Sequence, residues 1–457
     1  MRLRNAPWIL LCDIGPIPGS DPDDTTENSQ QDLSGSDFPS LSQAASTNKK
    51  HYDPTPHLSY VRNLQQRQPP RTAIERFGMG YQDYLQAPLQ PLTVNLESIT
   101  YEVFEKDPVK YEWYERAVAK ALKDWAEQKK PTSNPDGRVV VVVVGAGRGP
   151  LVTRTLQASA DTGVEIDLWA VEKNPNAFVL LQRHNEAVWG GRVTLVQSDM
   201  RSWKGPRREK DPQLQHASTG VSLGIASPLL SNPNPSEADS TQSPTQPPEI
   251  SPMYIDIVIS ELLGSFGDNE LSPECLDGVT HLLNPVYGIS IPASYSAHFT
   301  PIAAPRLHAE VMSQSAVNPT ASETPYVVML HAIDYLSTAN GSSDSSSKNP
   351  NRHSPVSTSP GAEPPSPFVQ AAWSFSHPNK NIPPQTPLQS TISNAHNVRR
   401  TQLTFPCQNR GACHGLAGYF ETVLYRDIEL STNPTTMDSK SPSMISWFPI
   451  YFPFKVR

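Results

Sequence analysis

The sequence is poor in cysteine, in basic charge and in long apolar runs. Its cysteines, Cys12, Cys275, Cys407 and Cys413, are too few and too scattered for a disulfide framework, and no second pair completes a zinc site with the last two. This usage fits a reducing, intracellular compartment. The net charge of -8 offers no general basic field for nucleic acid. No run of about 18 apolar residues occurs, so we expect no membrane span.

Proline, in contrast, is abundant. The chain has 47 prolines in 457 residues and is only 37% hydrophobic, so we expect part of it not to pack into a core. Residues 204–252 and 338–367 are rich in Ser, Pro and Asn. Such a composition cannot supply a packed interior. We therefore interpret both stretches as surface insertions and not as domains.

The clearest local pattern is a strand, a glycine turn and a helix. Six consecutive valines, Val139–Val144, predict a strand buried on both faces, as in a parallel sheet. The turn Gly145-Ala-Gly147-Arg-Gly149 follows directly, and a predicted helix resumes at Leu151. Glycines in such a turn let a ligand approach the N–H groups at a helix start. This arrangement is typical of nucleotide-binding, doubly wound α/β folds.

Two further strand ends carry polar candidates. The predicted strand Glu165–Val171 is followed by Glu172, just over twenty residues after the turn, where an acidic side chain commonly accepts ribose hydroxyls. A predicted helix, 176–188, and a third strand, Val193–Gln197, lead to Asp199 and Met200. All of these residues belong to the carboxyl edge of one predicted sheet.

A pair of carboxylates follows the next β-branched run. Glu261 comes directly after the predicted strand ending near Ile259, and a tight glycine loop brings Glu270 back beside it nine positions later. An isolated pair of this kind is more often a solvated acidic loop. Because the pair shares its sheet edge with the nucleotide-type residues, we interpret it as a site for a cation.

The rest of the chain divides around this unit. We predict a strand at Trp8–Ile14, helical segments between Tyr60 and Leu85, and a helix at Tyr111–Lys129 with Pro108 in its first turn. After the unit, short strands predict an antiparallel β domain; they are Ile289–Ile291, Ser294–Phe299, Tyr326–Leu330, Ala371–Phe375, Gln402–Phe405, Gly415–Asp427 and Trp447–Phe454.

Five ordered motifs carry a resemblance to a known family. They are Tyr101-Glu-Val-Phe-Glu-Lys-Asp-Pro, Gly145-Ala-Gly-Arg-Gly-Pro-Leu, Ala170-Val-Glu-Lys-Asn-Pro-Asn, Ser260-Glu-Leu-Leu-Gly-Ser-Phe-Gly-Asp-Asn-Glu-Leu-Ser-Pro-Glu-Cys-Leu-Asp-Gly and Gly418-Tyr-Phe-Glu-Thr-Val-Leu-Tyr. Together they resemble the protein arginine methyltransferases, specifically the type II branch that forms symmetric dimethylarginine. The resemblance runs from Trp8 to the last residue and is of a fungal kind, with low-complexity insertions.

The resemblance implies a domain plan. Residues 1–75 would be a remnant of an N-terminal TIM barrel, 76–290 a Rossmann-like domain that binds S-adenosylmethionine, and 291–457 an incomplete antiparallel, β-barrel-like domain. Members of this family begin with a whole barrel and continue past the equivalent of Arg457. We therefore expect a chain truncated at both ends.

The resemblance also implies roles for individual residues. The implied catalytic pair that holds the guanidinium is Glu261 and Glu270. The implied cofactor contacts are Tyr101, Lys110, Tyr111, Gly145, Gly147, Glu172, Asp199 and Met200, with Glu172 on the ribose, Asp199 and Met200 on the adenine, and Lys110 and Tyr111 near the amino-acid end. Phe104 matches the phenylalanine associated with symmetric products, and Trp447 the aromatic residue that lies along the arginine. No metal is implied.

The implied partners are histones, splicing-related proteins and other proteins with arginine-glycine-rich segments, together with a homo-oligomer and a WD-repeat adaptor. Direct nucleic-acid or membrane binding is not expected, and the implied location is cytoplasm and nucleus. Two alternatives stay open. One is a methyltransferase of the same fold acting on a small molecule or nucleic acid, which has no need of Glu261 with Glu270. The other is a catalytically impaired fragment or scaffold of the family.

Overall fold

The computed structural model describes residues 56–67, 70–209, 250–339, 366–380, 382, 394–407 and 411–455. The predicted strand Trp8–Ile14 lies outside these residues, as does most of both predicted insertions. Of the expected TIM-barrel remnant, 1–75, only 56–67 and 70–75 are described, and the barrel assignment stays a prediction. The ends of the first insertion pair as a small ribbon of β4 (Arg207–Glu209) and β5 (Ile250–Pro252). In the described part of the chain, no helix has the length and apolar character needed to span a membrane.

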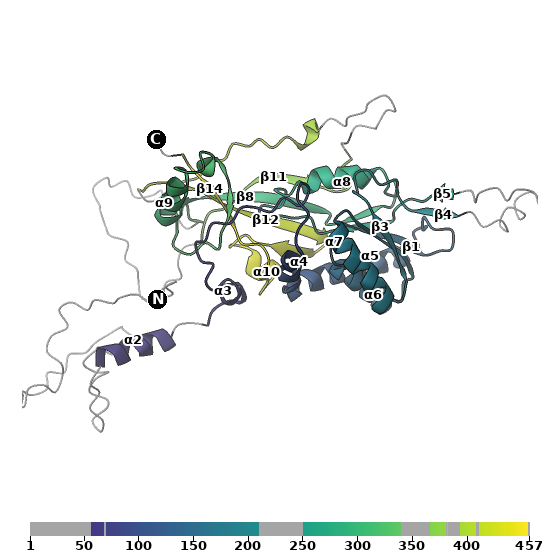
Figure 1. Cartoon of the computed structure of the whole chain (residues 1–457), viewed down its shortest axis with the longest axis horizontal. Coiled ribbons are helices and arrows are strands. Elements are labelled where there is room, and N and C mark those ends of the chain that lie inside the picture. Colours follow the sequence, from purple (N-terminus) through teal and green to yellow (C-terminus); the bar gives the residue numbers. More distant parts are fainter. Residues whose placement is uncertain are drawn as a thin grey trace, which may run out of the picture.

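A parallel sheet forms one half of the fold, as predicted (Figure 1, labels β1 and β3), but it has five strands where the sequence indicated four. Its order is β3-β2-β1-β6-β7, and its strands are β1 (Val139–Val144), β2 (Ile166–Glu172), β3 (Val193–Gln197), β6 (Ile257–Ser260) and β7 (Ile289–Ile291). All neighbouring strands run parallel. The carboxyl ends of β1, β2, β3 and β6 therefore meet at one edge, where the predicted polar residues follow them.

The valines of β1 explain how this sheet is covered. Val139, Val141 and Val143 pack into one core, whereas Val140, Val142 and Val144 pack into another. The first core receives α5 (Pro108–Glu127), α6 (Pro150–Thr162) and α7 (Pro175–Ala187), and the second receives α8 (Ser272–Thr280). A strand buried on both faces needs apolar side chains at every position, as the valine run predicts.

A seven-stranded antiparallel sheet forms the other half. Its strands are β8 (Ser294–Ala303), β9 (Tyr326–Val327), β10 (Asp334–Tyr335), β11 (Gln370–Ser376), β12 (Gly415–Tyr425), β13 (Ile428–Ser431) and β14 (Ile450–Pro453). The long pair β8 and β12 is its centre, in register from Ile302 opposite Gly415 to Ser294 opposite Val423. Leu424, Leu430 and Met444 join the same core as α5, so the two sheets share an apolar interface.

The remaining helices are short. They are α2 (Pro56–Gln66), α3 (Ala73–Phe77), α4 (Ser98–Glu105), α9 (Pro305–Gln314), α10 (Met437–Lys440) and the 3₁₀ turns Ala321–Glu323 and Ala395–Asn397. The predicted helical character holds for α2 and α3 but stops at Phe77, earlier than the expected Leu85. Beyond Gly78, Gln82 and Gln86 instead form bridges to the region of β9.

Two strand predictions were wrong. Ile289–Ile291 does not belong to the antiparallel sheet, because it pairs parallel with β6 at the edge of the first sheet. Gln402–Phe405 forms no strand, although Leu403 and Phe405 do pack on the β domain. Segments of three or four residues have too little pattern of their own to specify a partner, so the surrounding structure decides their pairing.

Candidate active site

One cavity of about 530 Å³ lies at the carboxyl edge of the parallel sheet, next to the β domain. All of the residues predicted for the site line it: Tyr101, Phe104, Lys110, Tyr111, Gly145, Gly147, Glu172, Asp199, Met200, Glu261, Glu270 and Trp447. They come from α4, α5, the ends of four strands and the segment before β14. The sequence separates them by up to 346 positions, from 101 to 447, and the fold brings them together.

The glycine turn gives one end of the cavity its shape. Gly147 has a φ of +56°, and a Cβ placed on it would lie 3.0 Å from Cε1 of Tyr101. A side chain there would be strained and would press on the ring. No side chain caps the start of α6 after this turn. The turn therefore presents backbone to the cavity, as a nucleotide-type ligand requires.

Glu172 lies beside this turn and is only 5% exposed. Its Oε2 accepts a hydrogen bond from Gly147 N at 2.7 Å, and its Oε1 accepts one from Asn174 N at 2.7 Å. Burial raises the pKa of Glu172 above its ordinary value. Its two oxygens are thus held at the cavity wall, in the place expected for an acceptor of ribose hydroxyls.

Asn174 is a site residue that the sequence reasoning missed. Its Nδ2 donates to the hydroxyl of Tyr101 at 3.2 Å, and its Oδ1 caps α7 through Asn176 N. It also lines the cavity. An Asn before Pro at a predicted helix start is a recognisable cap signal, but the bond to α4 depends on the fold.

Asp199 and Met200 form the far wall. Arg201 donates to both carboxylate oxygens of Asp199, from Nε at 3.0 Å and from Nη2 at 2.7 Å. These hydrogen bonds lower the pKa of Asp199. Met200 is partly buried against the core under β1 and β2. The expected contact of both residues with adenine stays a prediction.

The other end of the cavity is built around one cation. Lys110 is 2% exposed, and its Nζ lies 3.2 Å from Oε2 of Glu261. The ring centroids of Phe104, Tyr111 and Trp447 lie 5.4, 4.9 and 4.9 Å from the same nitrogen. Burial alone would lower the pKa of Lys110, but the charge and the hydrogen bond of Glu261, together with Tyr111 and Asp107, outweigh burial and raise the pKa. The ammonium is therefore charged and caged by rings and a carboxylate.

Glu270 binds its proton more tightly than an ordinary glutamate. Burial, together with the charge of Glu261, raises the pKa of Glu270 to about 8. Two carboxylates that share a buried site cannot both ionise freely, so one of them holds its proton more tightly. Burial also raises the pKa of Tyr111 to about 12, which keeps its hydroxyl neutral.

The loop between the two glutamates is folded tightly, as predicted. Gly264 and Gly267 exchange backbone hydrogen bonds of 3.1 and 2.8 Å, and Asn269 Oδ1 accepts from Phe266 N at 2.7 Å. A Cβ on Gly264 would lie 2.3 Å from that amide oxygen. Only glycine fits there, and this close approach turns the chain so that Glu270 returns to the cavity.

Asp107 is a second residue that sequence reasoning missed. It is 1% exposed and accepts hydrogen bonds from four backbone N–H groups. Its Oδ1 accepts from Val109 N at 3.0 Å and Lys110 N at 3.3 Å, and its Oδ2 accepts from Ile445 N at 3.2 Å and Ser446 N at 2.7 Å. Asp before Pro at a predicted helix start signals a cap. The bonds to the segment that carries Trp447 could not be read from it.

Trp447 itself is held from two sides. Its Nε1 donates to Leu263 O at 2.8 Å, inside the glutamate loop, and its ring lies edge-on to Phe420 at 5.0 Å. Its φ of +64° is left-handed, which a bulky side chain adopts only where its surroundings require it. The indole plane is thus fixed against the ammonium of Lys110.

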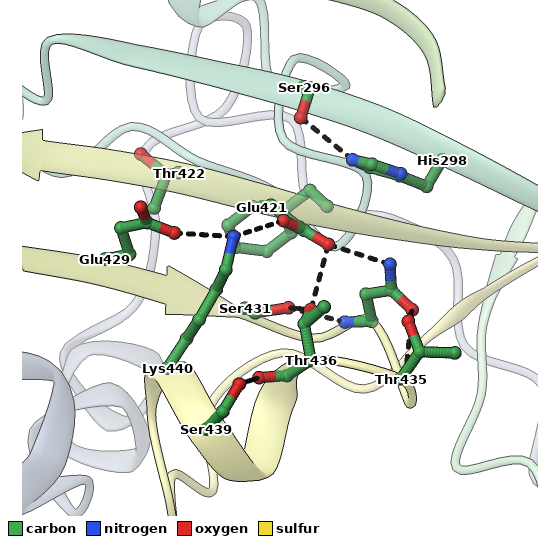
Figure 2. Close-up of polar contacts among 12 residues, drawn as sticks. Ser296, His298, Glu421, Thr422, Glu429, Ser431, Thr435, Thr436, Ser439 and Lys440 are labelled. Carbon is green, nitrogen blue, oxygen red and sulfur yellow. Dashed lines mark hydrogen bonds and ion pairs between the residues drawn. The ribbon is translucent and has the colours of Figure 1, made fainter. Parts of the chain in front are cut away.

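A polar cluster in the β domain anchors the chain just before Trp447. Figure 2 shows Lys440, at the end of α10, between the carboxylates of Glu421 on β12 and Glu429 on β13. Glu421 also accepts from Thr436 Oγ1 at 2.9 Å. The carbonyl of Lys440 accepts from Trp113 Nε1 on α5 at 2.9 Å. The residue from which the segment 441–449 continues is therefore held in place.

A further ion network lies behind the glutamate loop. Arg399 donates from Nε to Asp268, and from Nη1 and Nη2 to the two oxygens of Glu274 at 2.7 and 3.1 Å. Trp373 Nε1 donates to the other oxygen of Asp268 at 3.1 Å. This network ties the loop and α8 to the β domain. Nothing local in the sequence pointed to Arg399.

The residues that line the cavity fit a nucleoside cofactor. Within the residues that the structure describes, no group of three or more His, Cys, Asp or Glu side chains is placed to hold a metal ion. The glycine turn, the held oxygens of Glu172 and the wall at Met200 fit a nucleoside, and the neighbouring Lys110 fits an anionic end.

Comparison with known proteins assigns both halves of the chain to related family models. A model described as "PRMT5 arginine-N-methyltransferase" matches residues 72–291, and one described as "PRMT5 oligomerisation domain" matches residues 294–457.

Curated relatives agree. The chain is 40% identical over 396 residues to protein arginine N-methyltransferase skb1 of Schizosaccharomyces pombe, covering 87% of this chain and 49% of that protein. It is 38% identical over 405 residues to protein arginine N-methyltransferase 5 of Oryza sativa subsp. indica, with shares of 88% and 48%. The Xenopus laevis protein of that name is 39% identical over 402 residues, with shares of 87% and 49%. The chain thus spans about half the length of the curated relatives it matches.

Among solved structures, the chain is similar to one titled "Trypanosoma brucei PRMT1 enzyme-prozyme heterotetrameric complex with AdoHcy". The TM-score is 0.45 at 14% sequence identity, over 79% of this chain and 82% of that one.

Proposed function

The chain belongs to the PRMT5 family of arginine N-methyltransferases, and from this premise we propose that it methylates arginine side chains of proteins with S-adenosylmethionine as methyl donor. The observation that carries the proposal is the caged cation. Glu261 and the rings of Phe104 and Trp447 hold an ammonium in the same cavity as the nucleoside-type wall at Glu172. A guanidinium is recognised by the same combination of carboxylate and aromatic faces.

The proposed chemistry begins with orientation of the substrate. A guanidinium stays protonated, with a pKa above about 12, and is a poor nucleophile. Glu261 and Glu270 can each accept forked N–H bonds, which fixes the planar group and draws positive charge away from the attacking nitrogen. When bound, S-adenosylmethionine supplies a methyl group on a sulfonium that this nitrogen can attack. Holding an arginine in line contributes up to roughly 7–11 kcal/mol to lowering the barrier.

We propose that Glu270 accepts the proton that the guanidino nitrogen loses after methyl transfer. A general base works best when its pKa is near the operating pH, and that of Glu270 is raised to about 8. Glu261, which pairs with the ammonium of Lys110 in this structure, is the proposed anionic partner of the guanidinium. The remaining residues hold the donor: Glu172 by ribose hydroxyls, Asp199 and Met200 at adenine, and Tyr101, Lys110 and Tyr111 over it.

We further propose the type II outcome, monomethylarginine and symmetric dimethylarginine. Phe104 supports it, because its ring lies 5.4 Å from Lys110 Nζ and edge-on to Tyr101 at 6.5 Å. A bulky ring at this place restricts which nitrogen of a monomethylated arginine can turn toward the donor.

Substrates and assembly are proposed on the same basis. Histones, splicing-related proteins and other proteins with arginine-glycine-rich segments are the proposed substrates, in cytoplasm and nucleus. The match of residues 294–457 to an oligomerisation domain supports a homo-oligomer, and a WD-repeat adaptor is a further proposed partner. Light scattering after gel filtration tests self-association, since a monomer at micromolar concentration would contradict it.

The test of the activity is transfer of labelled methyl to an arginine-glycine-rich peptide by the purified chain. We expect Glu261→Gln and Glu270→Gln each to lower the rate at least about 100-fold, in the range of lost general acid-base catalysis. Glu112→Gln is the matched control, because Glu112 lies on the surface of α5 at 47% exposure and should stay within about twofold of the parent. Equal rates in all four proteins would refute the assignment. Cofactor binding without transfer by the parent would favour the alternative of an impaired scaffold.

A further inference from the structure

The ammonium of Lys110 occupies the groups that the proposed function gives to arginine. Its Nζ lies 3.2 Å from Glu261 Oε2, and the rings of Phe104 and Trp447 are within 5.4 Å. Its positive charge also reaches Glu270, whose pKa it lowers against the larger effects of burial and Glu261. An incoming guanidinium would need the same carboxylate and the same ring faces.

One set of anions cannot hold both cations well. Two positive charges in a poorly hydrated site repel each other strongly, and the ammonium of Lys110 is only 2% exposed. If Lys110 leaves Glu261, it must reach another anion at once, because a buried unpaired charge is costly. The guanidinium can therefore enter only when an alternative anion is available to Lys110.

The backbone around Lys110 is held in place, so any movement is confined to its side chain. The backbone N of Lys110 donates to Asp107, which also holds Ile445 N and Ser446 N, so the start of α5 and the Trp447 segment are fixed to one another. A lysine stem is flexible and its three donors rotate freely. The cavity continues from Lys110 to the glycine turn, so an anionic end of a nucleoside bound there lies in reach.

We infer that Lys110 guards the arginine subsite: it keeps Glu261 occupied until the carboxylate of S-adenosylmethionine is present to receive its ammonium. Lys110 thereby orders binding, with the cofactor before the arginine. The inference rests on the proposed function and adds to it a positive coupling between the two ligands. Coupling of this kind commonly amounts to about 5- to 150-fold in affinity.

The parent chain tests the inference without any substitution. The affinity of a labelled arginine-glycine-rich peptide is measured by fluorescence anisotropy alone, with saturating S-adenosylhomocysteine, and with saturating 5′-methylthioadenosine. Neither nucleoside can donate a methyl, and only the first has the carboxylate. We expect the first to lower the peptide Kd at least about fivefold and the second to leave it within about twofold.

Lys110→Met then removes the guard while keeping the length of the side chain. We expect this variant to bind peptide without any nucleoside about as tightly as the parent does with S-adenosylhomocysteine, and to lose the dependence on the nucleoside. Lys106→Met is the matched control, since Lys106 is an exposed lysine at the end of α4 and carries the same charge change. It should keep the parent's ratio of the peptide Kd without S-adenosylhomocysteine to the peptide Kd with it. A role of Lys110 in stability alone would lower the melting temperature without strengthening peptide binding.

Three results would overturn the inference. They are equal peptide affinity with and without S-adenosylhomocysteine in the parent, an equal effect of 5′-methylthioadenosine, and an unchanged ratio in Lys110→Met. In each of these cases the proposed function is not contradicted, provided that the parent chain still binds both the nucleoside and the peptide. A parent chain that binds neither the nucleosides nor the peptide would instead refute the proposed function together with the inference.

Discussion

Glu261 and Glu270 are close in sequence and in space, yet their surroundings differ. Glu261 has the ammonium of Lys110 at 3.2 Å and also accepts from Leu263 N at 3.3 Å. Burial and the charge of Glu261 raise the pKa of Glu270 to about 8. The pair therefore consists of one carboxylate that forms an ion pair with Lys110 and one carboxyl group that can take up or release a proton near neutral pH.

This difference predicts how stability depends on pH. The folded-state pKa of Glu270 is raised from 4.5 to about 8, so the folded chain keeps a proton that the unfolded chain loses. The stabilisation is full below about pH 4.5 and is lost as pH rises through about 8. We expect Glu270→Gln, which stays neutral, to gain on the parent in urea unfolding between pH 5 and 8, by up to about 1.4 kcal/mol per pH unit.

Glu112→Gln serves again as the control, because its carboxylate is at the surface. It should follow the parent's pH dependence throughout. Parallel curves for the parent and Glu270→Gln over this range would show that Glu270 is ionised in the folded chain at neutral pH.

Phe104 predicts the product. Methionine in its place is narrower and flexible, so both nitrogens of a monomethylated arginine gain access to the donor. We expect Phe104→Met to form asymmetric as well as symmetric dimethylarginine, as measured by mass spectrometry of the modified peptide. The Kd of S-adenosylhomocysteine should stay within about threefold, which separates a change of specificity from general damage. Symmetric product alone would remove Phe104 from this role.

At the scale of elements, the corner between α4 and α5 joins the two halves of the site. Asp107 caps α5 with one oxygen and holds Ile445 N and Ser446 N with the other. Lys110 and Tyr111 follow in the first turn of the helix, and Trp447 follows the held segment. One buried carboxylate thus ties the start of α5 to the segment that carries Trp447.

Substitutions at Asp107 separate its two bonds. Serine can still cap the helix but is too short to reach the Trp447 segment, whereas alanine loses both contacts. We expect both variants to weaken peptide binding in the presence of S-adenosylhomocysteine about fivefold or more. In urea unfolding, the free energy of unfolding of Asp107→Ala should be about 1 kcal/mol below that of Asp107→Ser, which is the usual value of a lost cap. Both should fall below the parent, because two buried N–H groups lose their acceptor.

The cap of α3 offers a comparison. Thr72 accepts from Glu75 N and has no bond to the Trp447 segment. Thr72→Ala should lose about as much free energy of unfolding as the loss of a helix cap costs. It should bind the peptide as the parent does. If Asp107→Ser also bound peptide normally, the bonds to Ile445 and Ser446 would have no part in positioning Trp447.

In the molecule as a whole, the loop between Glu261 and Glu270 depends on the β domain. Asp268 lies between the two glutamates in sequence, is 4% exposed and is held by Arg399 and Trp373, which both belong to the second half of the chain. Arg399 also pairs with Glu274 on α8. The parallel sheet supplies the glutamates, but its partner half holds their loop.

Arg399→Met tests this dependence. It leaves two largely buried carboxylates without their cation, so we expect a loss of about 3 kcal/mol in unfolding free energy, together with a fall in methyl transfer larger than any change in cofactor affinity. Arg400→Met is the matched control, since Arg400 is the exposed neighbour and should change stability by no more than about 0.5 kcal/mol. Equal effects of the two substitutions in urea unfolding would exclude a specific role for the Arg399 network.

Much of the fold was predictable because its signals are local. The valine run and Val193–Gln197 form strands with the predicted bounds, and the helix expected from Tyr111 begins at Pro108, in whose first turn that proline fits. The edge strand Ile289–Ile291 was assigned to the wrong sheet, since three residues do not specify a partner. The helical pattern before Leu85 ended early, at Phe77, where contacts with the region of β9 take over.

Local sequence specifies which chemical groups stand at the carboxyl edge of the sheet, because strand ends and glycine turns are encoded by neighbouring residues. How these groups meet depends on the long-range packing of the fold. Lys110 and Glu261 are separated by 151 positions, Asp107 and Ser446 by 339, and Asp268 and Arg399 by 131. Contacts over such distances follow from the packing of two sheets around α5, and no local pattern of residues contains that information.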